Sequence, residues 1–135
     1  MLAVTTYPQD YIDRCRTRID ALLAAYRPVA AAATPGLVDA LEPLLFNDLT
    51  LVLDHCFVHR LRNREGKDGN PLNEVRMICR SILTHGGVLG ADKTIRYKPE
   101  TSVVKLEIGD EIRLDEARFT ALAEAFFAEI EQRYT

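Results

Sequence analysis

Residues His55–Arg76 read HCFVHRLRNREGKDGNPLNEVR, and this stretch decides how the chain is organised. An apolar run with helical spacing leads into it, and Asn70 followed by Pro71 marks the start of another helix at its far end. Between the two, the segment EGKDG is predicted to be a flexible turn. The stretch therefore predicts two neighbouring antiparallel helices joined by a polar, glycine-rich connection.

The apolar run before the turn is predicted to form a long helix over about Leu44–Arg62. Its apolar side chains cover almost the whole circumference of a helix, which is typical of a central helix. Pro43 precedes it and predicts a kink or a break near Glu42. Arg60 projects into the apolar face and needs a carboxylate partner, for which Glu74 on the returning helix is the nearest candidate.

The segments on either side complete a predicted fold that is mainly α (α+β). The first amphipathic helix is expected to stop at Pro28, and Thr34 with Pro35 begins the next. Residues 102–114, SVVKLEIGDEIRL, alternate apolar and polar residues, which predicts a small β hairpin with a three-residue loop, Gly109–Glu111. Asp115 then caps a C-terminal helix. We expect a compact helical domain of four to five helices with this hairpin before the C-terminal helix. The apolar stripe of the C-terminal helix consists of Phe119, Leu122, Phe126, Phe127, Ile130 and Tyr134.

Length and composition predict a single globular domain over residues 1–135. At this length, with 47% apolar residues, a core can form without disulfides or a structural metal. The three cysteines are odd in number and far apart, so we interpret them as reduced core residues. The sequence shows no leader pattern and no long apolar run. These features predict a soluble, cytoplasmic protein without membrane association.

Charge is distributed unevenly along the chain. The net charge of −3 argues against a general nucleic-acid binder. Between Arg60 and Arg80, however, six Lys or Arg residues face three acids, while between Glu107 and Glu131 eight acids face two Arg residues. The two regions could neutralise each other across the fold or across a dimer interface, or the basic region could be an anion site. Aromatic-rich outer helices and separated charges together predict a two-fold homodimer.

The basic turn supplies the first candidate site. Backbone N–H groups at the start of the Pro71 helix would face a bound anion, which nearby cations would neutralise. The spacing matches neither a P-loop, a dinucleotide fingerprint nor a calcium loop, so the alternative is a polar, well-capped helix connection. The function hypothesis is a non-catalytic helical module that binds an anionic small molecule or an acidic protein partner around residues 55–76. The candidate ligand-binding residues are Arg62, Arg64, Lys67, Asn73 and Arg76.

A second candidate site is a metal centre formed by Asp48, His55 and His59. The two imidazoles lie one turn apart on one helical face, with Asp48 two turns earlier in the same stripe. The corresponding function hypothesis is a metal-dependent hydrolase that binds a negatively charged substrate through Arg62 or the basic turn. Other than this divalent metal, no cofactor is predicted. Arg62 belongs to the same stripe. Because the helix is expected to be buried, these four residues should line one polar pocket or inter-subunit cavity that faces the Lys67–Asn73 turn.

Overall fold

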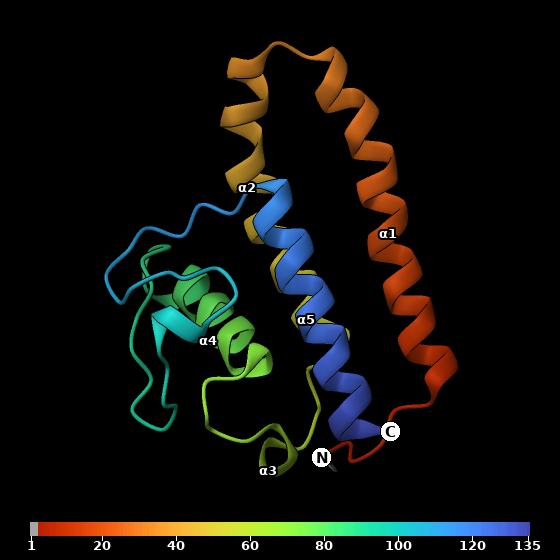
Figure 1. Ribbon diagram of the computed structural model, residues 1–135, viewed down its shortest axis with the longest axis vertical. Coiled ribbons are helices and arrows are strands. Elements are labelled where there is room, and N and C mark those ends of the chain that lie inside the picture. Colours follow the sequence, from red (N-terminus) through yellow and green to blue (C-terminus); the bar gives the residue numbers. More distant parts are fainter. Residues whose placement is uncertain (1–2) are drawn as a thin grey trace.

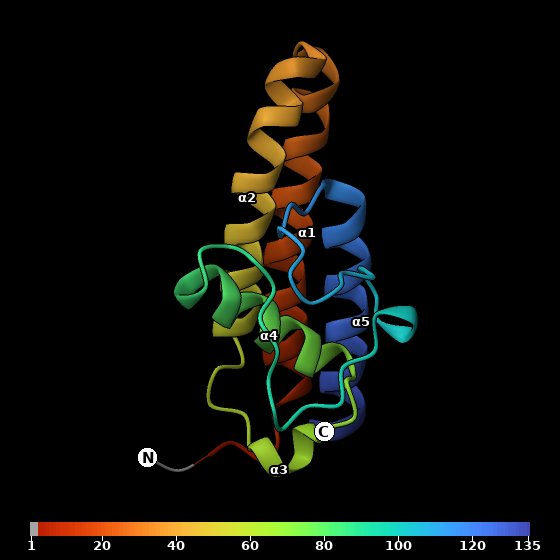
Figure 2. The same ribbon diagram turned by 90° about the vertical axis from the view of Figure 1, so that its left-hand side faces the viewer.

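Two long helices form an antiparallel hairpin, against which the rest of the chain packs (Figure 1). The computed structural model describes residues 3–135. The hairpin consists of α1 (Gln9–Ala32) and α2 (Pro35–His55), and the C-terminal helix α5 (Glu116–Tyr134) packs on both. Figure 2 shows from the side that the joined ends of α1 and α2 extend beyond the other helices.

The remaining elements lie at the lower part of the hairpin. Helix α4 (Pro71–Thr84) packs on α2 and α5, and the single-turn helix α3 (Arg62–Glu65) lies near the end of α5 (Figures 1 and 2). A long irregular segment, interrupted only by the 3₁₀ helix η1 (Pro99–Thr101), connects α4 to α5. No helix of the described residues combines the length and apolar character that a bilayer span requires.

One apolar core joins α1, α2, α4 and α5. All six residues of the predicted stripe on α5 are buried, as the periodicity of that segment indicates. The predicted caps are confirmed, because the side chains of Asn70 and Asp115 accept hydrogen bonds from the backbone N–H groups of Leu72 and Arg118. Aromatic rings gather where the start of α1 meets the ends of α2 and α5, around Phe57.

Neither proline stops its helix, contrary to the sequence-based expectation. Helix α1 continues through Pro28 to Ala32, on an exposed face where water can bond the carbonyl that the proline leaves free. Helix α2 continues through Pro43 without a break. The adjacent Glu42 ties the three long helices together, since it accepts hydrogen bonds from the Tyr26 hydroxyl at 2.5 Å and the backbone N–H of Glu116 at 3.1 Å.

Helix α2 ends at His55 and not at Arg62, so the predicted helix is too long by two turns. The backbone of residues 59–61 pairs instead with the N-terminal segment, where Val4 donates to the His59 carbonyl and accepts from the Leu61 N–H. The helix is also less central than its composition indicates, because Leu37 and Leu44 are 67% and 71% exposed. Both the N-terminal segment and the burial of Arg60 favour a chain reversal over further helix.

The predicted β hairpin is wrong, since residues 3–135 contain no β-strand and only two isolated bridges. Residues 109–112 pair with residues 87–89 instead of with 102–108, through the Leu89–Asp110 and Ile112–Gly87 backbone hydrogen bonds. The start of the expected first strand is held by α4 instead, because Val103 and Val104 donate to the buried carboxylate of Glu74 at 2.8 and 2.9 Å. The fold class is therefore helical and not α+β.

Candidate functional site

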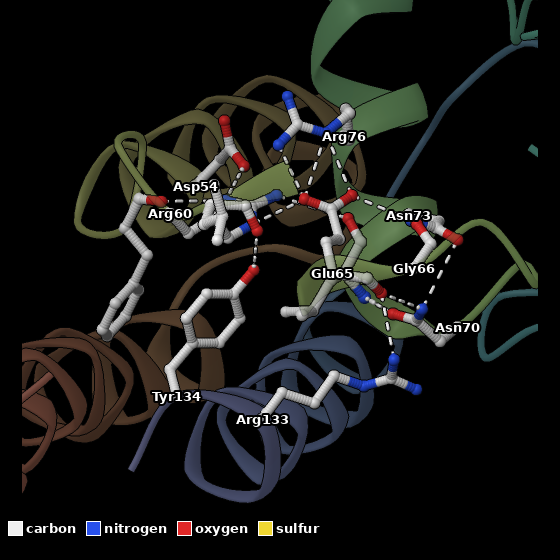
Figure 3. Close-up of polar contacts among 12 residues, drawn as sticks. Asp54, Arg60, Glu65, Gly66, Asn70, Asn73, Arg76, Arg133 and Tyr134 are labelled. Atoms are coloured by element: carbon white, nitrogen blue, oxygen red, sulfur yellow. Dashed lines mark hydrogen bonds and ion pairs between the residues drawn. The ribbon is translucent and has the colours of Figure 1, made fainter. Parts of the chain in front are cut away.

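The basic turn is organised around the buried carboxylate of Glu65, the last residue of α3. Its side chain is fully buried and accepts hydrogen bonds from the guanidinium groups of Arg60 and Arg76 and from the amide of Asn73 (Figure 3). The donor distances are 2.9 Å for Arg60, 2.7 Å for Arg76 and 2.8 Å for Asn73. Three elements that are separate in the sequence therefore meet on one anion.

Arg60 forms ion pairs with two carboxylates at once. Its side chain is fully buried, and it donates to Glu65 and, at 2.9 Å, to Asp54 near the end of α2. The predicted need of Arg60 for a carboxylate is thus confirmed, but the predicted partner Glu74 is wrong. The prediction assumed that the helix continues to Arg62. The chain instead reverses at residues 56–61 and brings Glu65 back to Arg60.

The pKa values of the two buried glutamates, Glu65 and Glu74, are shifted in opposite directions. Burial alone would raise the pKa of Glu65, but the hydrogen bond from Arg76 and the charges of Arg60 and Arg76 hold it below the usual value. Burial raises the pKa of Glu74, whose carboxylate is stabilised by the backbone N–H groups of Val103 and Val104 and a more distant Lys105. Glu65 is accordingly an anion with its donors in place.

The glycine-rich loop after α3 is fixed by side-chain amides rather than flexible. Asn70 donates to the Glu65 carbonyl at 2.7 Å, and Asn73 donates to the Gly66 carbonyl at 3.0 Å and accepts from the Gly69 N–H at 2.9 Å. Gly69 has φ +86°, and a Cβ there would lie 2.5 Å from the carbonyl oxygen of Arg96. The close approach of these two segments requires glycine at this position.

The structure divides the five predicted ligand-binding residues into two groups. Asn73 and Arg76 belong to the buried network and are occupied by Glu65 and the loop. Arg62, Arg64 and Lys67 are exposed, and none of them joins an ion pair with any residue in 3–135.

Two of the exposed cations share a hollow in the surface. Arg62 and Lys67, together with Asn63 and Gly66, line a concavity of 590 Å³ beside α3. Arg64 does not line it and donates to the Arg133 carbonyl at 3.2 Å. The hollow therefore offers two unpaired positive charges, one on α3 and one on the loop that the side chains of Asn70 and Asn73 fix.

The predicted metal-ligand set does not come together. His55 and His59 are exposed and line a hollow of 190 Å³ with Tyr11 and Cys56, whereas Asp48 is exposed on α2 and lies outside it. No group of three or more His, Cys, Asp or Glu side chains in residues 3–135 is arranged to hold a metal ion. Among the described residues, the hollow of the two histidines shares no lining residue with that of Arg62 and Lys67, so these side chains do not line one common hollow.

Cys56 and Cys79 are poor nucleophiles. Burial, with a smaller contribution from neighbouring Cys15, raises the pKa of Cys56 to about 11, and burial raises the pKa of Cys79 as well. Thiols with raised pKa values hold little thiolate near neutral pH.

Comparison of the chain with family models, with curated proteins and with solved structures finds no match.

Proposed function

We propose that the protein is a helical module that binds an anionic small molecule in the hollow beside α3, with Arg62 and Lys67 as the charged contacts. The observation that carries this proposal is that both side chains are exposed, line the same concavity and have no carboxylate partner among the described residues. Some exposed cations elsewhere, such as Arg14 and Arg113, pair with acids, while others, such as Lys98 and Arg118, do not, so the shared concavity is what distinguishes Arg62 and Lys67.

The buried network supports the proposal by fixing the site. Arg60 and Arg76 are both paired with Glu65, so these two guanidiniums anchor α3 and its loop and leave the ligand to Arg62 and Lys67. A site held in place before binding loses less conformational entropy when the ligand arrives. The hollow has the volume of a small-molecule site, and phosphate or carboxylate groups suit its two cations.

The test is titration calorimetry with inorganic pyrophosphate and tripolyphosphate. The double variant Arg62→Ala/Lys67→Ala should bind at least about tenfold more weakly, because it loses charge-assisted hydrogen bonds that each contribute about 1.5–3 kcal/mol. The matched control is Lys98→Ala/Arg118→Ala, which removes the same charge from two exposed, unpaired positions elsewhere and should bind like the wild type.

Three outcomes would contradict the proposal. Absence of binding to either anion is the first, and equal weakening in both double variants, which indicates a general charge effect, is the second. The third is binding of an acidic peptide such as polyglutamate without binding of the phosphates. That result would favour an acidic protein partner at the same residues.

A further inference from the structure

The basic region of the chain is larger than the hollow beside α3. Residues 60–96 contain eight Lys or Arg residues and four acids, although the whole chain has a net charge of −3. Five of these eight cations are exposed and join no ion pair with any residue in 3–135. They are Arg62, Arg64, Lys67, Lys93 and Arg96.

The four acids of the same stretch all have other partners. Asp68 lies 3.9 Å from a guanidinium nitrogen of Arg133, and Asp92 lies 3.9 Å from one of Arg80. The remaining two acids are the buried glutamates, whose donors are described above. The exposed cations of residues 60–96 are therefore left for a ligand from outside the chain.

Residues 92–96 lie against the loop that carries Lys67. The backbone N–H of Arg96 donates to the Lys67 carbonyl at 2.8 Å, and Gly69 of the same loop is in close contact with the Arg96 carbonyl. Figure 2 shows the chain after α4 passing in front of that helix toward α3. The exposed side chain of Arg96 thus begins beside the hollow, and Lys93 follows three positions away in the same segment.

Arg62 approaches the same segment from α3. Hydrogen bonds from Thr94 and, less strongly, the charges of Arg80 and Arg62 lower the pKa of Asp92. The charge of Arg62 therefore acts on the turn next to Lys93. Both cations of the hollow are close to residues 92–96, so the basic surface continues from the hollow onto this segment.

The exposed side chains of the described residues suit phosphate groups but not nucleic-acid bases. Guanidinium groups bind phosphate through two parallel hydrogen bonds, and lysine supplies a point charge. Proteins that bind single-stranded nucleic acid also stack the bases on aromatic side chains. No Phe or Tyr residue in 3–135 is exposed, however, and the sequence contains no Trp. The surface therefore favours a chain of phosphates that has no bases.

We propose that the anion bound in the hollow is part of a linear polyphosphate chain, which continues from Arg62 and Lys67 to Lys93 and Arg96. This inference rests on the proposed function, because it names the class of anion that binds at the same site and extends the contact beyond the hollow. A chain of phosphates contacts all four cations at once, whereas a short phosphate contacts only the two in the hollow.

The test is titration calorimetry with tripolyphosphate and with a linear polyphosphate much longer than tripolyphosphate. Lys93→Ala/Arg96→Ala should weaken binding of the long chain at least about tenfold and change binding of tripolyphosphate by less than about twofold, because only the long chain reaches these positions. For the long chain, the dependence of the logarithm of affinity on the logarithm of salt concentration should become shallower by about 1–2, since two fewer cations displace counterions.

The matched control is Arg18→Ala/Arg118→Ala, which removes two exposed cations of α1 and α5 that join no ion pair in residues 3–135. This variant should bind both phosphates like the wild type. Because each comparison uses the same long chain, it excludes the advantage that a longer chain gains from offering more places to bind. Circular dichroism verifies that the variants are folded.

Three results would overturn the inference and leave the proposed function in place, provided that tripolyphosphate still requires Arg62 and Lys67. The first is a long chain that Lys93→Ala/Arg96→Ala binds as tightly as the wild type does, and the second is equal weakening in the control variant. The third is tighter binding of single-stranded polyuridylate than of polyphosphate, which would identify a nucleic acid as the ligand. If neither tripolyphosphate nor the long chain binds, both proposals are wrong.

Discussion

Glu65 shows how a fully buried charge is kept in this molecule. Desolvation of a lone carboxylate is unfavourable, but two guanidiniums and one amide surround this one. The same three donors come from the turn after α2 and from α4, so the charge also fixes how these elements meet. Removing the anion leaves two cations facing each other with too few partners.

We therefore predict that Glu65→Gln lowers the free energy of unfolding by about 3–5 kcal/mol, the usual cost of breaking a buried ion pair on one side. Urea unfolding at neutral pH measures this change. Glu107→Gln, at an exposed glutamate, is the control and should change the free energy by less than about 0.5 kcal/mol. If Glu65→Gln also lowers the free energy of unfolding by less than about 0.5 kcal/mol, Glu65 does not hold the buried network together.

The pH dependence gives a second measurement of the same prediction. Because the pKa of Glu65 is lower in the folded chain than its usual 4.5, the unfolded chain takes up the proton first as the pH falls. The contribution of Glu65 is thus fully present above about pH 4.5 and is lost below it. The difference in stability between wild type and Glu65→Gln should stay constant down to that pH and narrow under more acidic conditions.

Gly69 is the residue at which loop geometry is most demanding. We predict that Gly69→Ala destabilises the fold by at least about 1–3 kcal/mol, because φ is +86° and the added Cβ meets the Arg96 carbonyl oxygen at 2.5 Å. Gly36→Ala is the control, since that position within α2 is open and its φ is not positive. Thermal unfolding should show the control unchanged or up to about 1 kcal/mol more stable.

At the level of elements, local signals predicted helix starts better than helix ends. The caps Asn70 and Asp115 and the apolar stripe of α5 are read correctly because each depends on residues within a few positions. The end of α2 depends on Val4 and on a buried ion network, and neither is visible in the periodicity of the helix. Long-range partners therefore decide where this helix stops.

The segment predicted to be a hairpin shows the same limit. Its alternation correctly indicates that Val104, Leu106, Ile112 and Leu114 face the core. The alternation cannot indicate which backbone groups pair, and here a side chain of α4 takes two N–H groups of the expected strand. Burial on one face is thus satisfied without a second strand.

We predict that Glu74→Ala releases this segment locally. The variant removes the acceptor of one half-buried and one buried N–H group, so the amides of Val103 and Val104 should exchange with solvent at least about tenfold faster. Hydrogen exchange followed by NMR resolves both amides. In the control Glu100→Ala, at an exposed carboxylate of η1, the two rates should stay as in the wild type. Unchanged rates in Glu74→Ala would show that other contacts hold the segment.

At the level of the whole molecule, the sequence predicted where the cations concentrate but not which of them are buried in ion pairs and which are exposed and unpaired. The concentration of cations between Arg60 and Arg80 correctly directed attention to the turn. The chain reversal before α3 decides which cations pair with Glu65 and which stay unpaired. The same reversal separates the two histidines from the turn. A one-dimensional pattern carries no information on this partition.

The shape of the molecule leads to a last prediction, on how stability is distributed. The buried residues of α1 end at Leu23 and those of α2 begin at Phe46, and Glu42 is the outermost tie to α1 and α5. Residues 28–41, at the tip of the hairpin, therefore contact mainly each other (Figure 2). Their amides should exchange through local opening, whereas those in α4 and α5 should require global unfolding, because local stability follows buried contacts. Native-state hydrogen exchange in increasing urea measures both classes. The tip amides should show little urea dependence and the core amides a steep one, and equal protection throughout would mean that contacts beyond those of a single chain hold the tip.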